Sequence, residues 1–188
     1  VHVGSSGYAY LSNTDIHYAA TALDANAQNA RATLHNCVLT KANYGVLVYS
    51  PYAEVQAENC LIADNLLTGV FVRADSRHTF RNCTIVGNGS TYRGPTQRNA
   101  GIHVGGASLT LENSIVAFNG SGLHHFGDPP AVTVRNCDFY NPDTDEIWWD
   151  GDPGKPDLTV DGNLIADPLF IDSEEGNYEL MGGSPAID

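Results

Sequence analysis

ATLHNC, residues 32–37, is the stretch that decides the fold, because the chain repeats it. Clear copies end at Cys60, Cys83, Ser114 and Cys137. An earlier copy, AYLSNT, ends at Thr14, and a degenerate copy, LTVDGN, ends at Asn163. The shared asparagine recurs every 23 residues, except for one spacing of 31 after residue 82, and the degenerate copy has Gly162 at this position, 26 residues after Asn136. A fixed period in the twenties predicts a solenoid.

Each period contains three short runs with the alternation of a β-strand. One run precedes the asparagine (Leu109–Leu111), one follows it (Thr84–Val86), and the third begins with glycine (Gly69–Val72). The regularly placed leucines and helical segment of a leucine-rich repeat are absent. The pattern therefore predicts an all-β, single-stranded parallel β-helix over residues 1–188, with about seven coils of three strands. Residues 161–188 break the period, and we expect them to cap the C-terminal end.

The repeated asparagine has a structural explanation. A one-residue corner between strands needs a left-handed backbone, which asparagine tolerates better than most residues. Stacked coils place these amides at the inter-strand spacing of about 4.8 Å, so that each can bond its neighbour. We therefore predict an asparagine ladder with no catalytic role at Asn13, Asn36, Asn59, Asn82, Asn113 and Asn136.

With this ladder, the chain resembles the right-handed parallel β-helices of the pectate-lyase-like superfamily. Its tail, Asp167–Asp188, is similar to the closing segment of secreted bacterial β-helix repeat proteins. The resemblance implies a right-handed coil and a secreted, extracellular protein. It specifies a scaffold rather than a chemistry.

The amino-acid composition limits the classes of molecule that the protein is expected to bind. Nine Lys and Arg against 22 Asp and Glu give a net charge of −13, which disfavours nucleic acid, anionic membranes and polyanionic glycans unless cations intervene. No apolar run approaches the ~20 residues of a membrane span. The chain opens in a strand-like stretch, Val1–Val3, without a capping helix, and solenoids need caps. We therefore expect further domains of a longer polypeptide at the N-terminal end.

The four cysteines share one position of the repeat, where alternation turns the side chain inward. We predict buried free thiols that pack as small hydrophobic groups. A disulfide is the lesser alternative, and zinc is disfavoured because no CxxC or nearby histidine pair exists. The stack comprises Cys37, Cys60, Cys83 and Cys137, interrupted by Ser114.

Candidate site residues lie on the strand that begins with glycine. Alternation places Val46, Val70 and Ile102 inside, so the intervening side chains face solvent. One outward column reads Asp24, Leu47, Phe71, His103, His124 and Trp148. The next reads Asn26, Tyr49, Arg73, Gly105, Phe126 and Asp150. The alternative is that loops cover Phe71 and Trp148, or that the phase is off by one in the sixth coil.

The longer spacing marks an insertion, residues 89–98, that directly precedes this strand and carries Tyr92, Arg93 and Arg98. Loops on one face of a solenoid often build its binding site, so we expect the insertion to form a lip beside the columns. We expect no cofactor. Calcium is left open, with Asp143, Asp145, Asp150 and Asp152 as candidate ligands, although a solvated acidic loop explains them as well.

Aromatic rings flanked by hydrogen-bonding groups on a flat sheet suit a polysaccharide, because sugars lay C–H faces on rings. Of the polygalacturonase motifs, only Asn13-Thr14-Asp15 is present, and the two lysines, Lys41 and Lys155, lie off the columns. We therefore expect a non-catalytic module that binds a neutral plant glycan such as xylan within a secreted glycan-degrading enzyme. In outline the chain is similar to β-helix carbohydrate-binding modules of xylanases.

Two alternatives remain. One is a polysaccharide lyase or epimerase that uses His103, His124, Arg73 and Tyr49. The other is a structural spacer or adhesin stalk, which explains the repeat but not the exposed rings.

Overall fold

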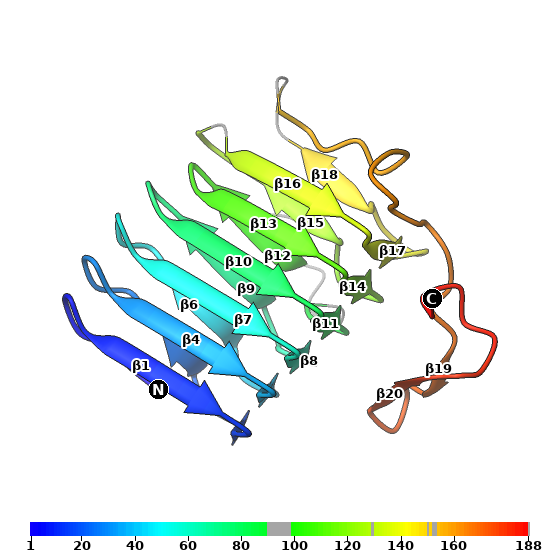
Figure 1. Ribbon diagram of the computed structural model, residues 1–188, viewed down its shortest axis with the longest axis horizontal. Helices are drawn as coiled ribbons and strands as arrows, with labels where there is room; N and C mark the ends of the chain where they lie inside the picture. Colours follow the sequence, from blue (N-terminus) through cyan, green and yellow to red (C-terminus); the bar gives the residue numbers. More distant parts are fainter. Residues whose placement is uncertain (90–98, 129, 150, 152–153, 188) are drawn as a thin grey trace.

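The computed structural model describes residues 1–89, 99–128, 130–149, 151 and 154–187. Across these residues the chain winds into a parallel β-helix, and each coil contributes one strand to each of three six-stranded parallel sheets (Figure 1). The expected all-β fold is confirmed. Six coils carry all three strands, and a seventh is partial, because Leu164 only bridges Asp138 of the sixth.

The strands of the first sheet precede the repeated asparagine; they are β1 (Tyr8–Ser12), β4 (Arg31–His35), β7 (Glu54–Glu58), β10 (Arg77–Arg81), β13 (Ser108–Glu112) and β16 (Ala131–Arg135). The second sheet follows it, with β2 (Asp15–His17), β5 (Val38–Thr40), β8 (Leu61–Ala63), β11 (Thr84–Val86), β14 (Ile115–Ala117) and β17 (Asp138–Tyr140). The third sheet holds β3 (Thr21–Asp24), β6 (Tyr44–Val48), β9 (Thr68–Arg73), β12 (Ala100–Gly105), β15 (Leu123–His125) and β18 (Ile147–Trp149).

Equivalent residues of successive coils pair, so the interior is built of columns. Val46, Val70 and Ile102 form one such column and are completely buried, as alternation predicts. Leu39, Ile62 and Ile85 form another on the second sheet. The result is one continuous apolar core along the helix axis. Because the strands pair at a fixed spacing, the outward side chains of successive coils are spaced in the same way as the inward ones.

The predicted asparagine ladder is present at the corner between the first and second sheets. All six asparagines have positive φ angles, between 49° and 54°. Their amides bond along the stack: Asn36 Nδ2 donates to Asn13 Oδ1 at 3.2 Å, and Asn59 Nδ2 donates to Asn36 Oδ1 at 3.3 Å. These side chains are exposed, so each bond competes with water.

A second asparagine row is buried at the corner between the second and third sheets. Asn88 is fully buried, and its Oδ1 accepts bonds from both the backbone N–H and the Nδ2 of Asn65, at 3.1 and 2.9 Å. Its own Nδ2 donates to the carbonyl of Ile62 at 2.9 Å. The equivalent bonds recur at Asn119 and Asn141. This inner row satisfies backbone groups that the core would otherwise leave unpaired.

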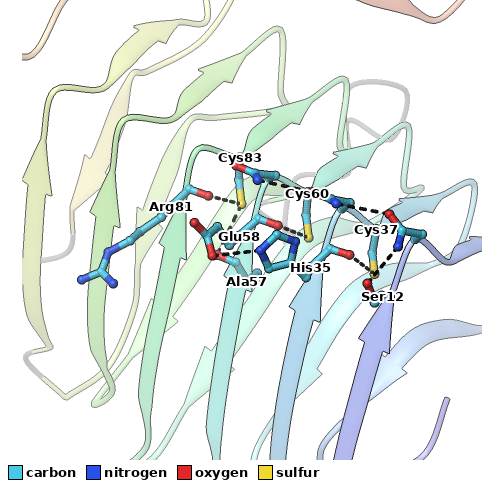
Figure 2. Close-up of polar contacts among 11 residues, drawn as sticks. Ser12, His35, Cys37, Ala57, Glu58, Cys60, Arg81 and Cys83 are labelled. Atoms are coloured by element: carbon cyan, nitrogen blue, oxygen red, sulfur yellow. Dashed lines mark hydrogen bonds and ion pairs between the residues drawn. The ribbon is translucent and has the colours of Figure 1, made fainter.

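The four cysteines are free and buried, as predicted. Figure 2 shows Cys37, Cys60 and Cys83 in a row, each thiol directed at the carbonyl two residues earlier. Ser114 makes the equivalent bond, from Oγ to the carbonyl of Glu112, at 2.8 Å. The serine therefore continues the row without breaking it, because a hydroxyl donates to the same acceptor.

The tail divides between the main core and the flank of the second sheet. Leu158 belongs to the buried core, against which Trp149 of the last coil also packs. The hairpin β19 (Phe170–Asp172) and β20 (Asn177–Leu180) instead lies along the flank of the second sheet, where it covers Ala63, Val86 and Ala117. The hairpin therefore packs on the side of the solenoid. The apolar face of the hairpin packs against small outward-facing residues of the second sheet. In addition, the hydroxyl of Tyr178 donates a hydrogen bond to Asp64 Oδ1 at 2.8 Å.

The long spacing after Asn82 leaves the sheets undisturbed. On the near side, Val86 pairs with Ala63, and on the far side Ala100 pairs with Thr68. The extra residues are therefore accommodated at a single corner, between β11 and β12. Residues 90–98, with the predicted lip of Tyr92, Arg93 and Arg98, lie outside the described part of the chain.

Candidate functional site

The predicted outward column on the third sheet is confirmed by strand register. Leu47 pairs with Phe71, Phe71 with His103, and the same alignment extends to both ends. The complete column is Asp24, Leu47, Phe71, His103, His124 and Trp148. A glycine is the second residue of β6, β9 and β12 and directly precedes β15, and this repeated position marks the phase from which sequence alone located the column.

The rings of this column contact one another without a gap. Phe71 and His103 stack with ring centroids 4.3 Å apart and an 11° interplanar angle. His103 and His124 meet edge to face at 4.6 Å, and His124 meets Trp148 in the same way at 4.7 Å. Tyr49, from the next column, adds a contact with Phe71 at 4.9 Å. We call Tyr49, Phe71, His103, His124 and Trp148 the ring strip.

Burial within the ring strip differs from expectation. The two histidines were expected to face solvent, but only 9% of His103 and 2% of His124 is exposed. Phe71 and Trp148 are half-buried, and Tyr49 is 41% exposed. The correction has a physical reason: each imidazole lies between two neighbouring rings of the column, with ring centroids 4.3–4.7 Å apart, and these neighbours exclude solvent from it.

This burial governs the charge of His103. Loss of hydration, with smaller contributions from His124, Arg73 and His125, lowers the pKa of His103 to about 3. The imidazole is therefore neutral at neutral pH. Its Nε2 is buried and has no hydrogen-bond partner among the described residues. A neutral, stacked imidazole extends an apolar platform rather than presenting a charge.

The neighbouring column supplies the hydrogen-bonding and exposed groups. Arg73 pairs with Gly105, and Phe126 follows in the next coil, 47% exposed. A Cβ at Gly105 would lie 2.6 Å from the carbonyl oxygen of Phe126 and 3.5 Å from Arg73 Nε. Glycine at this position is thus required for the coils to approach and leaves room for the guanidinium.

Asp24, at the N-terminal end of the strip, is already engaged. Its Oδ2 lies 3.0 Å from His2 Nδ1, and its Oδ1 accepts the backbone N–H of Asn26 at 3.0 Å. Asp24 and Leu47 therefore form the edge of the strip rather than its centre.

Sequence reasoning missed Tyr44. Alternation gives it the phase of the interior residue Val46, but its ring meets Phe71 edge to face at 5.9 Å. Burial, and then the charge and hydrogen bond of Tyr49, raise the pKa of Tyr44. The sequence did contain a signal for Tyr44, because an aromatic residue stands there directly before Gly45. A residue next to a corner need not follow the strict alternation of the strand.

Two other expectations concern acidic residues. Asp150 and Asp152 lie outside the described residues. Asp143 and Asp145 are exposed on the loop before β18. In the described part of the chain, no three His, Cys, Asp or Glu side chains are grouped in a way that could hold a metal ion.

Comparison with known proteins agrees with the fold. The chain matches the family described as right handed beta helix region over residues 1–165, and it belongs to this family. The comparisons match no curated protein and no solved structure. Within the described ranges, no helix is long and apolar enough to cross a membrane.

Proposed function

We propose that the third sheet binds a polysaccharide without cleaving it, and that a neutral plant glycan such as xylan is the ligand. The ring strip is the observation that carries the proposal. Its five rings, one from each of five successive coils, succeed one another at 4.3–4.9 Å and form a rigid platform. Tyr49, Phe71 and Trp148 are its accessible rings, and the two nearly buried histidines hold Phe71 and Trp148 in line. An extended sugar chain presents C–H faces along its length, and such a platform matches that geometry.

The edges of the platform supply polar groups. Arg73 is half-buried beside the strip, and the hydroxyl of Tyr49 lies near that of Tyr44. These groups can bond sugar hydroxyls while the rings carry the apolar contact. The net charge of −13 favours a neutral over an anionic chain, because an acidic surface repels uronates.

The same geometry supports binding over turnover. A general base works best when its pKa is near the operating pH. The pKa of His103 is about 3 and its ring is held between two others, which suits a fixed contact better than proton transfer. We further propose, by resemblance to pectate-lyase-like β-helices and to β-helix modules of xylanases, that the domain serves a larger secreted glycan-degrading enzyme.

Alanine substitution on the strip tests the proposal. Phe71→Ala, Trp148→Ala and Tyr49→Ala each remove a ring contact of about 1 kcal/mol, so affinity for xylan should fall several-fold per site. Tyr10→Ala is the matched control: Tyr10 is 60% exposed on the first sheet, so affinity should not change. Isothermal titration calorimetry with xylan oligosaccharides supplies the affinities.

Absorbance at 235 nm checks for lyase products on the same glycans. Wild-type protein should release none. If unsaturated products form and His103→Ala abolishes them while binding persists, the site is a lyase and the binding-module proposal is wrong. If Phe71→Ala and Trp148→Ala combined leave binding intact, the ring strip is not the ligand platform.

A further inference from the structure

A groove of about 580 Å³ lies on the opposite side of the solenoid from the ring strip. It follows the corner between the first and second sheets, where the exposed amides of Asn82, Asn113 and Asn136 form one side. The tail residues Leu180, Pro185 and Ala186 form the other. The groove thus combines a regularly spaced row of amide donors and acceptors with an apolar wall.

Asp138 also lines the groove and is unusual for a carboxylate. It stands in the outward column of the second sheet, next to Ile115, yet only 3% of it is exposed. Its Oδ1 accepts the backbone N–H of Ala166 at 3.1 Å. Its Oδ2 is buried and has no hydrogen-bond partner among the described residues. A buried carboxylate oxygen without a donor is costly unless it is protonated or paired with a cation.

The surroundings favour a cation. Burial, and then the negative charges of Glu146 and Asp167, raise the pKa of Asp138 despite the bond from Ala166. Among the described residues that line the groove there is no Lys, Arg or His. The whole chain carries a charge of −13. A positively charged donor brought by a ligand would therefore meet a negative potential and an unsatisfied oxygen.

The tail wall of the groove is built on backbone hydrogen bonds within the tail itself. The backbone N–H groups of Gly183 and Ser184 donate to Met181, and that of Met181 donates to Leu169. All of these bonds stay within the tail. Among the described residues, the backbone bonds of this turn therefore do not tie it to the solenoid, and its contact with the groove is one of packing.

We propose that this groove binds a primary amine that also carries hydroxyl groups, such as a hexosamine. The ammonium group bonds Asp138 Oδ2, because a charge-assisted bond is the strongest that a buried carboxylate can accept. The hydroxyl groups bond the amides of Asn113 and Asn136, and the ring lies against Leu180 and Pro185. This site is separate from the glycan platform and does not depend on it.

Titration with glucosamine tests the proposal, with glucose and N-acetylglucosamine as controls that lack the free amine. Side-chain amide signals of Asn113 and Asn136 in two-dimensional NMR should shift with glucosamine, and at least about tenfold less affinity is expected for either control. Asp138→Asn keeps the acceptor for Ala166 but removes the charge, so glucosamine affinity should fall about tenfold. Asp143→Asn, which removes an exposed carboxylate elsewhere, should leave it unchanged.

Ala186→Phe fills the groove from the tail and provides a second test that does not touch the carboxylate. It should abolish the glucosamine shifts, whereas Phe71→Ala on the ring strip should not affect them. Equal affinity for glucose and glucosamine, or unchanged affinity in Asp138→Asn, overturns the amine assignment. Absence of any shift with glucosamine overturns the site.

Discussion

Asn88 shows how much one side chain contributes when both of its amide atoms serve the buried backbone. Substitution Asn88→Ala leaves the N–H of Asn65 and the carbonyl of Ile62 without these partners inside the core. We expect a loss of about 3–5 kcal/mol in the free energy of unfolding. Asn59→Ala, in the exposed ladder, should cost about 1 kcal/mol. Urea denaturation of both variants measures the difference, and equal losses would contradict the distinction.

Sequence alone could not predict which of the two asparagine rows contributes more to stability. Both recur once per coil, and the left-handed corner explains only the row that contains Asn59. Asn88 sits where the second sheet turns into the third, and its role depends on which way the amide points. That direction is decided by packing across coils, which a one-dimensional repeat does not contain.

His78 makes folding sensitive to acid. It is buried in the first sheet between Val55 and Leu109, and its Nε2 lies 2.7 Å from Ser76 Oγ. Burial lowers the pKa of His78 to about 3, against about 6.5 in the unfolded chain. Between these values the unfolded state binds the additional proton, so stability falls as the pH falls from 6.5 towards 3.

The substitution His78→Leu isolates this effect. The neighbours of residue 78 in the column, Val55 and Leu109, are apolar, so leucine suits the site. The loss of stability that comes from protonation of His78 in the unfolded state should then disappear. Between pH 5.5 and pH 4, the wild type should lose about 1.4 kcal/mol per pH unit more than the variant. Guanidinium denaturation across this range provides the two slopes. Parallel slopes would mean that His78 titrates normally in the folded protein.

At the scale of elements, the hairpin β19–β20 is a separable strap. Phe170 is 7% exposed and contacts the rings of Phe118 and Tyr178, whereas Ile171 in the same strand is 47% exposed. Phe170→Ala should release the hairpin from the flank, because the apolar contact there is small. Limited proteolysis within residues 169–181 should accelerate severalfold, while the β-sheet circular dichroism of the solenoid persists.

Ile171→Ala is the matched control for this prediction. It removes an aliphatic side chain from the exposed face of the same strand, so proteolysis should stay at the wild-type rate. Resistance of the Phe170→Ala variant would show that other contacts, such as the bond from Tyr178 to Asp64, suffice to hold the strap.

The elements that repeat were predictable and those that do not repeat were not. The copies of the asparagine motif located the three sheets and the column from Leu47 to Trp148, because each coil confirms the phase of the last. The hairpin occurs once, and its docking on Ala63 and Val86 depends on small outward residues meeting a distant segment. The burial of His103 likewise depends on ring-to-ring distances across coils, which alternation does not specify.

At the scale of the whole molecule, stability should vary along the axis, since each coil contacts only its neighbours. In the first coil, Leu11 and Ile16 are half-buried, whereas their partners Leu34 and Leu39 are fully buried. Hydrogen exchange measured by mass spectrometry should therefore show lower protection in β1 and β2 than in β7 and β8. Uniform protection would indicate that the solenoid opens as a single unit.

At the corner between β11 and β12, the length of the connection does not affect the register of the strands that it joins. The anchor spacing there is 31 residues rather than 23, yet the strands on both sides keep their register. Inter-strand bonding alone sets the rise of the solenoid, so the length of a corner is free to vary. New recognition segments can be grafted at this point, by evolution or by an engineer, without any change to the residues that hold the coils together.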